Sequence, residues 1–211
     1  MTKHSMLWFF AIIAVFMFSP LIMGQKDYQE CIGKELRTAY TWYNDEEVNN
    51  IIERANNLYD TMMVSTGIDP LLRKHFIKPI PLNEISPGVA LSKTVSPYAQ
   101  HMMEYWLNFL TNIWMFTFRV SHSIAWMIYL IPFLFAVLFD GYMTRKAKLA
   151  SFKYTSPTIY NLSWHFIIAM AASALVYFSL TVQIPILFYP SVLTAMGVLV
   201  RLVISNVQHS A

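Results

Sequence analysis

The chain contains few charged residues and a single cysteine. Charged residues make up 13% of the 211 positions, against about 25% in a typical soluble domain. Apolar residues make up 56%, which places the chain among membrane proteins. With Cys31 as the only cysteine, an intrachain disulfide and a cysteine-based metal site are excluded. Its role stays open between a free or structural thiol and a bond to a partner chain.

The sequence also lacks the motifs of familiar enzymes. It has no G-x-S-x-G, no phosphate-binding G-x-x-x-x-G-K-[ST] and no H-E-x-x-H, and its six histidines are scattered. No internal repeat is present. We therefore expect no catalytic residues, no cofactor and no metal.

The first segment, residues 1–24, is predicted to be a signal-anchor transmembrane helix. An apolar run of eighteen residues, Met6 to Met23, follows Lys3, and it would extend about 27 Å as a helix. Cleavage by signal peptidase is the alternative, but cutting after Gly24 places the large Ile22 at position −3. A retained helix is favoured.

Residues 25–97 are polar and predict a helical hairpin followed by a proline-rich loop. Asn44 or Asp45 can cap a helix whose apolar residues recur at helical spacing. A weaker pattern covers about residues 27–43, and a short helix is expected near residues 71–76. Residues 24–104 carry eight Lys/Arg and eleven Asp/Glu, whereas the rest of the chain carries seven and one.

Residues 98–122 predict an amphipathic, membrane-proximal helix. Its polar stripe, Glu104, Asn108 and Asn112, would not face lipid. The helix should therefore lie on the membrane, pack against the hairpin or join a partner helix. If it ran on to Phe139 it would measure about 60 Å, so either half stands outside the bilayer or a kink lies near residues 119–122. Arg119 and His122 are expected to snorkel to the interface.

Residues 123–140 predict a second span, with Pro132 at its middle. A proline there removes a backbone hydrogen bond and tends to kink the helix, which membranes tolerate when neighbouring groups compensate. Residues 141–162 predict a basic loop, which the positive-inside rule places in the cytoplasm. Asp140 could cap the basic segment or pair with a cation of a partner, while Gly141 follows it directly. The basic residues of the loop are Arg145, Lys146, Lys148 and Lys153.

Residues 163–211 predict a hairpin of two further spans, at about 164–182 and 191–204, whose short connection carries no charge. Small residues on both spans permit close helix contact. The fold expected is thus an all-α membrane protein with about four transmembrane helices and a helical domain between the first and second. Lys3 and the basic loop both place the N- and C-termini in the cytoplasm, and residues 25–120 largely on the outer side.

The second half, residues 99–211, resembles a known membrane family. The order of features carries the likeness: a Trp-containing amphipathic segment, Arg119, a span with Pro132, F-D-G-Y-M-T-R at 139–145, S-F-K-Y-T-S-P-T-I-Y at 151–160 and a terminal hairpin. It is similar to the DUF4400-type inner-membrane proteins of integrative conjugative elements and conjugative plasmids. In that family several arginines closely follow the Asp-Gly pair, whereas here the basic residues are mostly lysines.

The resemblance implies an inner-membrane accessory of bacterial conjugative DNA transfer. No catalytic residues are established for that family, so none are carried over to this chain. In a bacterium, the outer side assigned to residues 25–120 by the positive-inside rule is the periplasm. Its expected partners are membrane lipid and the coupling ATPase or other type IV secretion subunits. Direct DNA binding is not expected, because four charges beside a span are ordinary topology determinants. The alternative is a self-associating pore or exclusion protein, in which Glu104, Asn108 and Asn112 would line a path in a homo-oligomer.

Overall fold

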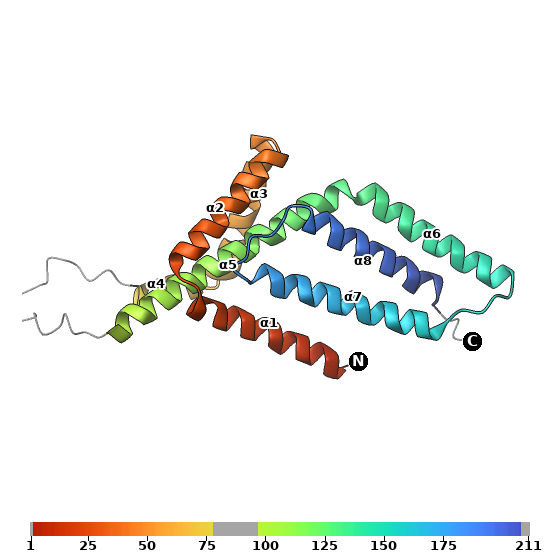
Figure 1. Cartoon of the computed structure of the whole chain (residues 1–211), viewed down its shortest axis with the longest axis horizontal. Coiled ribbons are helices and arrows are strands. Elements are labelled where there is room, and N and C mark those ends of the chain that lie inside the picture. Colours follow the sequence, from red (N-terminus) through yellow and green to blue (C-terminus); the bar gives the residue numbers. More distant parts are fainter. Residues whose placement is uncertain (1, 78–96, 208–211) are drawn as a thin grey trace, which may run out of the picture. The chain divides into compact units, whose positions relative to one another are not determined.

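A computed structural model describes residues 2–77 and 97–207, and within these ranges the chain is helical and contains no strand (Figure 1). The helices are α1 (Thr2–Ile22), α2 (Gln25–Trp42), α3 (Asp45–Tyr59), the π-helical turn η1 (Asp60–Val64), α4 (Ile68–Phe76), α5 (Pro97–Tyr129), α6 (Ile131–Ala150), α7 (Pro157–Phe178) and α8 (Phe188–Ser205). The all-α prediction is confirmed.

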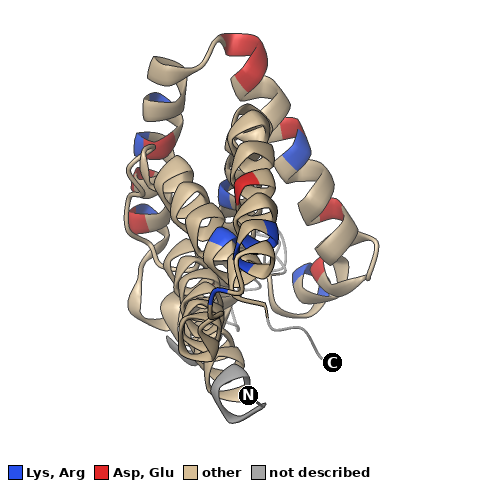
Figure 2. Ribbon diagram, turned by 90° about the vertical axis from the view of Figure 1, so that its right-hand side faces the viewer, with Lys and Arg blue, Asp and Glu red and all other residues tan. Residues whose placement is uncertain are grey.

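Two helices of the described chain are long and apolar enough to cross a membrane by themselves. They are α7, with a mean hydropathy of 1.5, and α8, with 1.6. Two bent pairs also qualify if each counts as one span: α1 with α2, bent by 112°, and α5 with α6, bent by 66°. Figure 2 shows long stretches of ribbon that carry no Lys, Arg, Asp or Glu. The chain thus has two helices that could cross a membrane, or four spans if each bent pair counts as one, which is consistent with a membrane protein.

The chain divides into two compact units. Unit 1 comprises residues 1–12, 122–178 and 184–211, and unit 2 comprises residues 13–121 and 179–183. Unit 2 thus includes the hairpin, most of α5 and residues 179–183 of the connection between α7 and α8. Unit 1 is built mainly from α6, α7 and α8.

The hairpin of unit 2 forms as the sequence predicts. The Asn44 side chain accepts a hydrogen bond from the Glu47 amide at 2.8 Å, and the Glu47 carboxylate accepts one from the Asn44 amide at 3.3 Å. This capping box starts α3 by satisfying two backbone donors that the helix leaves open. The α3 face with Val48, Ile51 and Ala55 is buried, as its apolar spacing predicted.

The rest of unit 2 packs around α5. Met63 of η1, Leu72 of α4 and Leu110 and Ile113 of α5 form one buried apolar cluster. On the α3 side, the Trp114 indole donates to Asn56 at 2.8 Å. The predicted short helix is present as α4, while the proline-rich residues 78–96 lie outside the described residues.

The kink in the long helical stretch lies at Leu130 rather than near residues 119–122. Pro132 is the second residue of α6, and the bend beside it agrees with the kink that a proline within the second span predicts. A proline lacks the backbone N–H that would bond to the carbonyl four residues earlier, and it disfavours helical geometry in the residue before it. Both effects are tolerated in the first turn of a new helix.

In unit 1, α8 packs against both α6 and α7. Helix α6 continues without a break through Asp140 and Gly141 to Ala150. The predicted second span over 123–140 is therefore split at Leu130, and much of the predicted loop over 141–162 is helical. Residues 151–156 connect α6 to α7.

Candidate functional site

A buried ion pair joins α2 to α5 within unit 2. Helix α2 buries Tyr28, Cys31, Glu35 and Ala39 along one face, which places a carboxylate on an otherwise mainly apolar stripe. Arg119 of α5 meets it. Its Nη2 donates to Glu35 Oε1 at 2.5 Å and its Nε donates to Glu35 Oε2 at 3.1 Å. This two-point geometry is the strong form of an arginine–carboxylate pair.

The connection between α7 and α8 completes the coordination of Arg119. Arg119 Nη1 donates to the Leu180 carbonyl at 2.6 Å, and Nη2 donates to the Val182 carbonyl at 2.8 Å. The side chain of Arg119 is 0% exposed and that of Glu35 is 4% exposed. A buried charge is tolerated when it is paired and its remaining donors are satisfied, and this guanidinium meets both conditions. We call Arg119, Glu35 and the two carbonyls the Arg119 clamp.

The prediction that Arg119 and His122 snorkel to a membrane interface was wrong. Arg119 is enclosed in the clamp, and His122 is only 3% exposed. Within unit 1, the His122 ring stacks on Tyr189 with centroids 4.5 Å apart and planes 5° apart. Each polar side chain is thus held by a specific partner far away in the sequence, which a count of local hydropathy does not show.

Cys31 lies beside the clamp and borders a small pocket. Its thiol donates to Glu35 at 3.7 Å and accepts from Arg119 at 3.4 Å. Burial, and next the charge of Glu35, raise the pKa of Cys31 from 9.0 to about 11. The thiol is therefore protonated at neutral pH, and a protonated thiol is a poor nucleophile.

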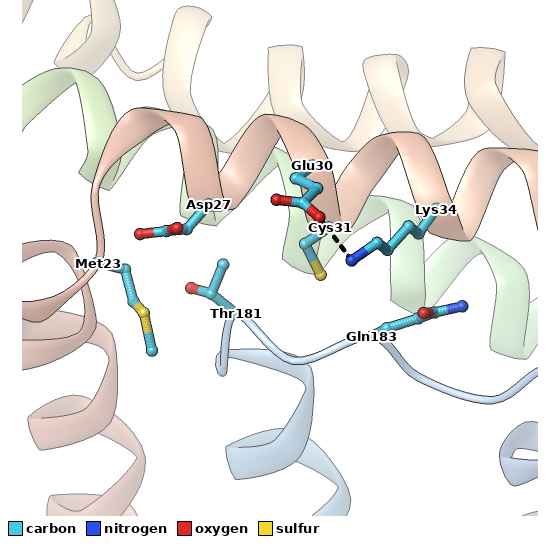
Figure 3. Close-up of a pocket in the computed structure, with 7 residues that line it drawn as sticks. All are labelled: Met23, Asp27, Glu30, Cys31, Lys34, Thr181 and Gln183. Carbon is cyan, nitrogen blue, oxygen red and sulfur yellow. Dashed lines mark ion pairs between the residues drawn. The ribbon is translucent and has the colours of Figure 1, made fainter.

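The pocket beside Cys31 has a volume of about 220 Å³. Across it, Met23, Cys31 and Lys34 face Thr181 and Gln183 of the α7–α8 connection (Figure 3). Lys34 is paired with Glu30 at 2.7 Å, one helical turn away. The pocket is polar, but it holds no activated nucleophile.

Two of the three residues of the predicted polar stripe of α5 are buried within unit 2, and the hydrogen bonds that Asn108 donates go to the end of α1 rather than to the hairpin. Asn108 Nδ2 donates to the Met23 carbonyl at 3.0 Å and to the Pro20 carbonyl at 3.4 Å. Asn108 is 5% exposed and Asn112 is 0% exposed, whereas Glu104 remains exposed. Asn108 and Asn112 are therefore covered by other residues of the unit, which agrees with the expectation that the stripe avoids lipid.

The predicted Asp140–Gly141 pair lies at the seam between α6 and α8 in unit 1. Asp140 forms an ion pair with Arg201 of α8, so its expected role as a helix cap was wrong and its cation comes from the same chain. Gly141 is buried, and a Cβ atom there would lie 3.2 Å from the Arg201 carbonyl oxygen and 3.3 Å from the Arg201 Cα. The absence of a side chain at Gly141 lets the α8 backbone approach.

Of the four basic residues, Lys148 also belongs to the seam. Its Nζ donates to the Ser205 carbonyl at 3.1 Å and to Asn206 Oδ1 at 2.9 Å, where a cation is favoured by the C-terminal end of α8. Lys146 lies over the Tyr142 ring at 4.9 Å, Arg145 is half-buried and Lys153 is exposed beyond the end of α6. The basic set thus divides into one seam residue and three others.

The hydrogen bonds and ion pairs of the clamp and of the α6–α8 seam join helices to one another. In the described part of the chain, no group of three or more His, Cys, Asp or Glu side chains could hold a metal ion. Sequence reasoning missed the pairing of Arg119 with Glu35. The signal available was Glu35 itself, a charged residue on the stripe that Tyr28 and Ala39 define, because such a charge needs a buried partner.

Comparison with known proteins identifies the family but no individual relative. Neither the curated proteins nor the solved structures contain a match to the chain. A family model described as "IncC plasmid conjugative DNA transfer protein DtrJ-like" matches residues 22–210. The match confirms the association with conjugation that the resemblance implied, under a family name other than DUF4400. It covers nearly the whole chain, including the clamp and the seam, and the chain therefore belongs to the DtrJ-like family of conjugative DNA transfer proteins.

Proposed function

We propose that this chain is a non-enzymatic inner-membrane accessory of a bacterial conjugative DNA-transfer apparatus. It would pack against the coupling ATPase or the channel of the type IV secretion machinery. The family membership supports a role in conjugation. The observation that carries the non-enzymatic role is the Arg119 clamp, in which a buried charged pair serves to join α2, α5 and the α7–α8 connection.

The proposed topology places both termini in the cytoplasm and residues 25–120 largely in the periplasm. Helix α1 would be the first span, because its residues Met6 to Ile22 carry no charge, whereas α2 carries six charged residues and would lie outside the bilayer. The basic C-terminal half of α6 would face the cytoplasm. Direct DNA binding is not part of the proposal, since Lys148 is used within the chain.

Co-purification tests the role. The full-length tagged protein would be extracted from donor cells in a mild detergent, with an unrelated tagged membrane protein as the control. We expect specific recovery of the coupling ATPase or a secretion subunit, and a lower transfer frequency when the gene is deleted. Recovery of the protein without any such component, together with an unchanged transfer frequency, would contradict the proposal.

Reporter fusions test the topology separately. A reporter that is active only in the cytoplasm should be active when it is inserted at Phe152, which is 98% exposed in the α6–α7 connection. A reporter that is active only in the periplasm should be active when it is inserted at Tyr43, between α2 and α3. The opposite pattern would show that the proposed orientation is wrong, and it would leave the proposed role in conjugation unchanged.

A further inference from the structure

Helix α6 of unit 1 ends with an aromatic residue at a position where glycine is usual. The Phe152 amide donates to the Leu149 carbonyl at 3.3 Å. The Lys153 amide donates to the Lys148 carbonyl at 2.9 Å. These two bonds form a Schellman motif, in which the residue after the helix adopts the left-handed conformation. Phe152 adopts it, with a φ of 52°, and is the only residue other than glycine with a positive φ in the described part of the chain. Its Cβ atom makes this conformation unfavourable.

The side chain of Phe152 points away from the rest of unit 1. It is 98% exposed, and Tyr154, two residues later, is 79% exposed. Phe152 is thus unfavourable in its backbone conformation and also in its contact with water. Because the ring is almost fully exposed, packing within the unit offsets neither cost. A strained backbone that presents an aromatic side chain to the outside indicates a contact beyond the chain.

Hydrogen bonds hold the α6–α7 connection level with the end of α8. The Ser156 amide donates to Asn206 Oδ1 at 3.4 Å. At the other end of the connection, Lys148 Nζ donates to the Ser205 carbonyl at 3.1 Å. Helix α8 is a candidate span that ends at Ser205, and its 18 residues extend about 27 Å, close to the hydrocarbon thickness. With α8 across the bilayer, the two aromatic residues of the connection lie at the membrane surface, where aromatic side chains are favoured.

The same end of unit 1 carries positive charge without negative charge to balance it. Residues 141–211 contain five Lys or Arg and no Asp or Glu. Two of the five, Lys148 and Arg201, are bonded within the seam. The other three, none of which has a carboxylate partner among the described residues, are Arg145, Lys146 and Lys153. Lys153 lies between the two exposed aromatic residues in the sequence, so the surface combines rings with cations.

We propose that the α6–α7 connection binds anionic phospholipids of the inner leaflet. Phe152 and Tyr154 enter the headgroup region, and Lys153 pairs with the negatively charged headgroups, while Arg145 and Lys146 add attraction from the last turns of α6. A nucleic acid also carries phosphates, but the bonds to the end of α8 hold the rings beside an apolar layer and therefore favour a lipid. The inference rests on the membrane placement of α6 to α8 in the proposed function, to which it adds the class of lipid.

The charge is tested with two lipids that differ only in the headgroup. The whole chain in detergent would be mixed with equal amounts of phosphatidylglycerol and phosphatidylethanolamine with identical acyl chains, and retained lipids would be counted by native mass spectrometry. We expect at least about tenfold preferential retention of phosphatidylglycerol, because each cation near an anionic surface contributes roughly a factor of five. Lys153→Gln should lower the preference by about fivefold. Arg37→Gln, which removes an exposed charge from α2 in unit 2, should leave it unchanged.

The aromatic contact is tested by substitution of Phe152. Phe152→Gly removes the ring and suits the left-handed conformation better, so the variant should unfold at the same temperature as the unchanged protein or at a higher one. It should nevertheless retain severalfold less of both lipids. Phe152→Trp keeps an aromatic ring at the position and should restore the retention. Unchanged retention in Phe152→Gly would contradict the insertion of the ring.

The remaining outcomes also decide the proposal. Equal retention of the two lipids by the unchanged protein would overturn it, as would a preference that Lys153→Gln leaves at full strength. If soluble glycerophosphoglycerol competes as well as the whole lipid, or if a single-stranded oligonucleotide binds more tightly than phosphatidylglycerol and Phe152→Gly abolishes that binding, the lipid assignment is wrong. Co-purification measures the conjugative role independently, so lipid selectivity can fail while the proposed function stands.

Discussion

Each of the two units places an arginine beside a carboxylate, and the surroundings of the pairs differ. In unit 2, Arg119 is 0% exposed and Glu35 is 4% exposed. In unit 1, Arg201 is 37% exposed and Asp140 is 54% exposed. Water screens the second pair and competes with it, whereas the first has no solvent to replace a lost partner. The same pair of chemical groups should therefore matter very differently to stability.

Removal of one clamp partner should have the largest effect. We expect Arg119→Ala to lower the free energy of unfolding by about 3–5 kcal/mol, because it leaves the Glu35 carboxylate buried without its cation. Thermal unfolding in detergent would measure the loss, with the exposed Arg37→Ala as the control. The double variant Arg119→Met with Glu35→Leu removes both charges and should recover much of the loss. A single variant as stable as the control would show that the pair is not buried.

The alkylation rate of Cys31 reports on the same region, and it can be measured without any substitution. Its pKa of about 11, against 9.0 for an ordinary thiol, corresponds to a thiolate fraction about a hundredfold lower at neutral pH. We expect alkylation of the folded protein to be slower by at least that factor than in denaturant. Arg119→Ala should accelerate it by opening the site. Rapid labelling of the unchanged protein would contradict the burial of the clamp.

The raised pKa of Cys31 also predicts the direction of a pH effect. Since the folded state favours the neutral thiol, its contribution to stability is complete below pH 9 and is lost as the pH rises through about 11. Unfolding followed between these pH values would show the decline. In Cys31→Ser, which has no group that titrates in this range, this component should be missing.

The seam of unit 1 should respond most to its closest backbone approach. Gly141→Ala places a methyl group 3.2 Å from a backbone oxygen of α8, and we expect a loss of about 1–3 kcal/mol from overpacking. Gly197→Ala is the matched control, because its methyl group would meet only the ends of the Phe133 and Leu134 side chains, at 3.2 and 3.3 Å, which can rotate away. Equal losses in the two variants would contradict this distinction.

Loss of the exposed pair should have the smallest effect. Asp140→Asn removes its charge, and we expect a change of less than about 1 kcal/mol that shrinks further in high salt. The same unfolding assay then gives the change in the free energy of unfolding for both Asp140→Asn and Arg119→Ala, and the two changes can be compared directly. A loss from Asp140→Asn as large as that from Arg119→Ala would mean that burial does not set the difference between the units.

Local patterns in the sequence were sufficient for much of the fold. The capping of α3 by Asn44 follows from residues within one turn, and the apolar periodicity of α3 gives its buried face. The apolar content of α7 and α8 marks them as candidate spans. Each of these features depends on neighbours in the chain, which is why it could be predicted.

The clamp and the seam could not be predicted in the same way, because they depend on partners far apart. Arg119 and Glu35 are 84 residues apart, so the local sequence around Arg119 indicated only a polar residue in an apolar stretch. Asp140 and Gly141 suggested the end of a helix, but Gly141 is there for the approach of α8. The sequence indicated that the polar stripe of α5 avoids lipid. It did not indicate which surface of the protein covers the stripe.

The composition of the clamp also sets an order of events during synthesis. Its carbonyl acceptors, Leu180 and Val182, are made some sixty residues after Arg119. A nascent chain that has just completed α5 already holds Glu35 and Arg119, but two hydrogen-bond acceptors for the guanidinium do not yet exist. Unit 2 can therefore mature only after α7 has left the ribosome, and a product truncated before residue 179 would carry an unfinished arginine site for quality-control proteases to recognise.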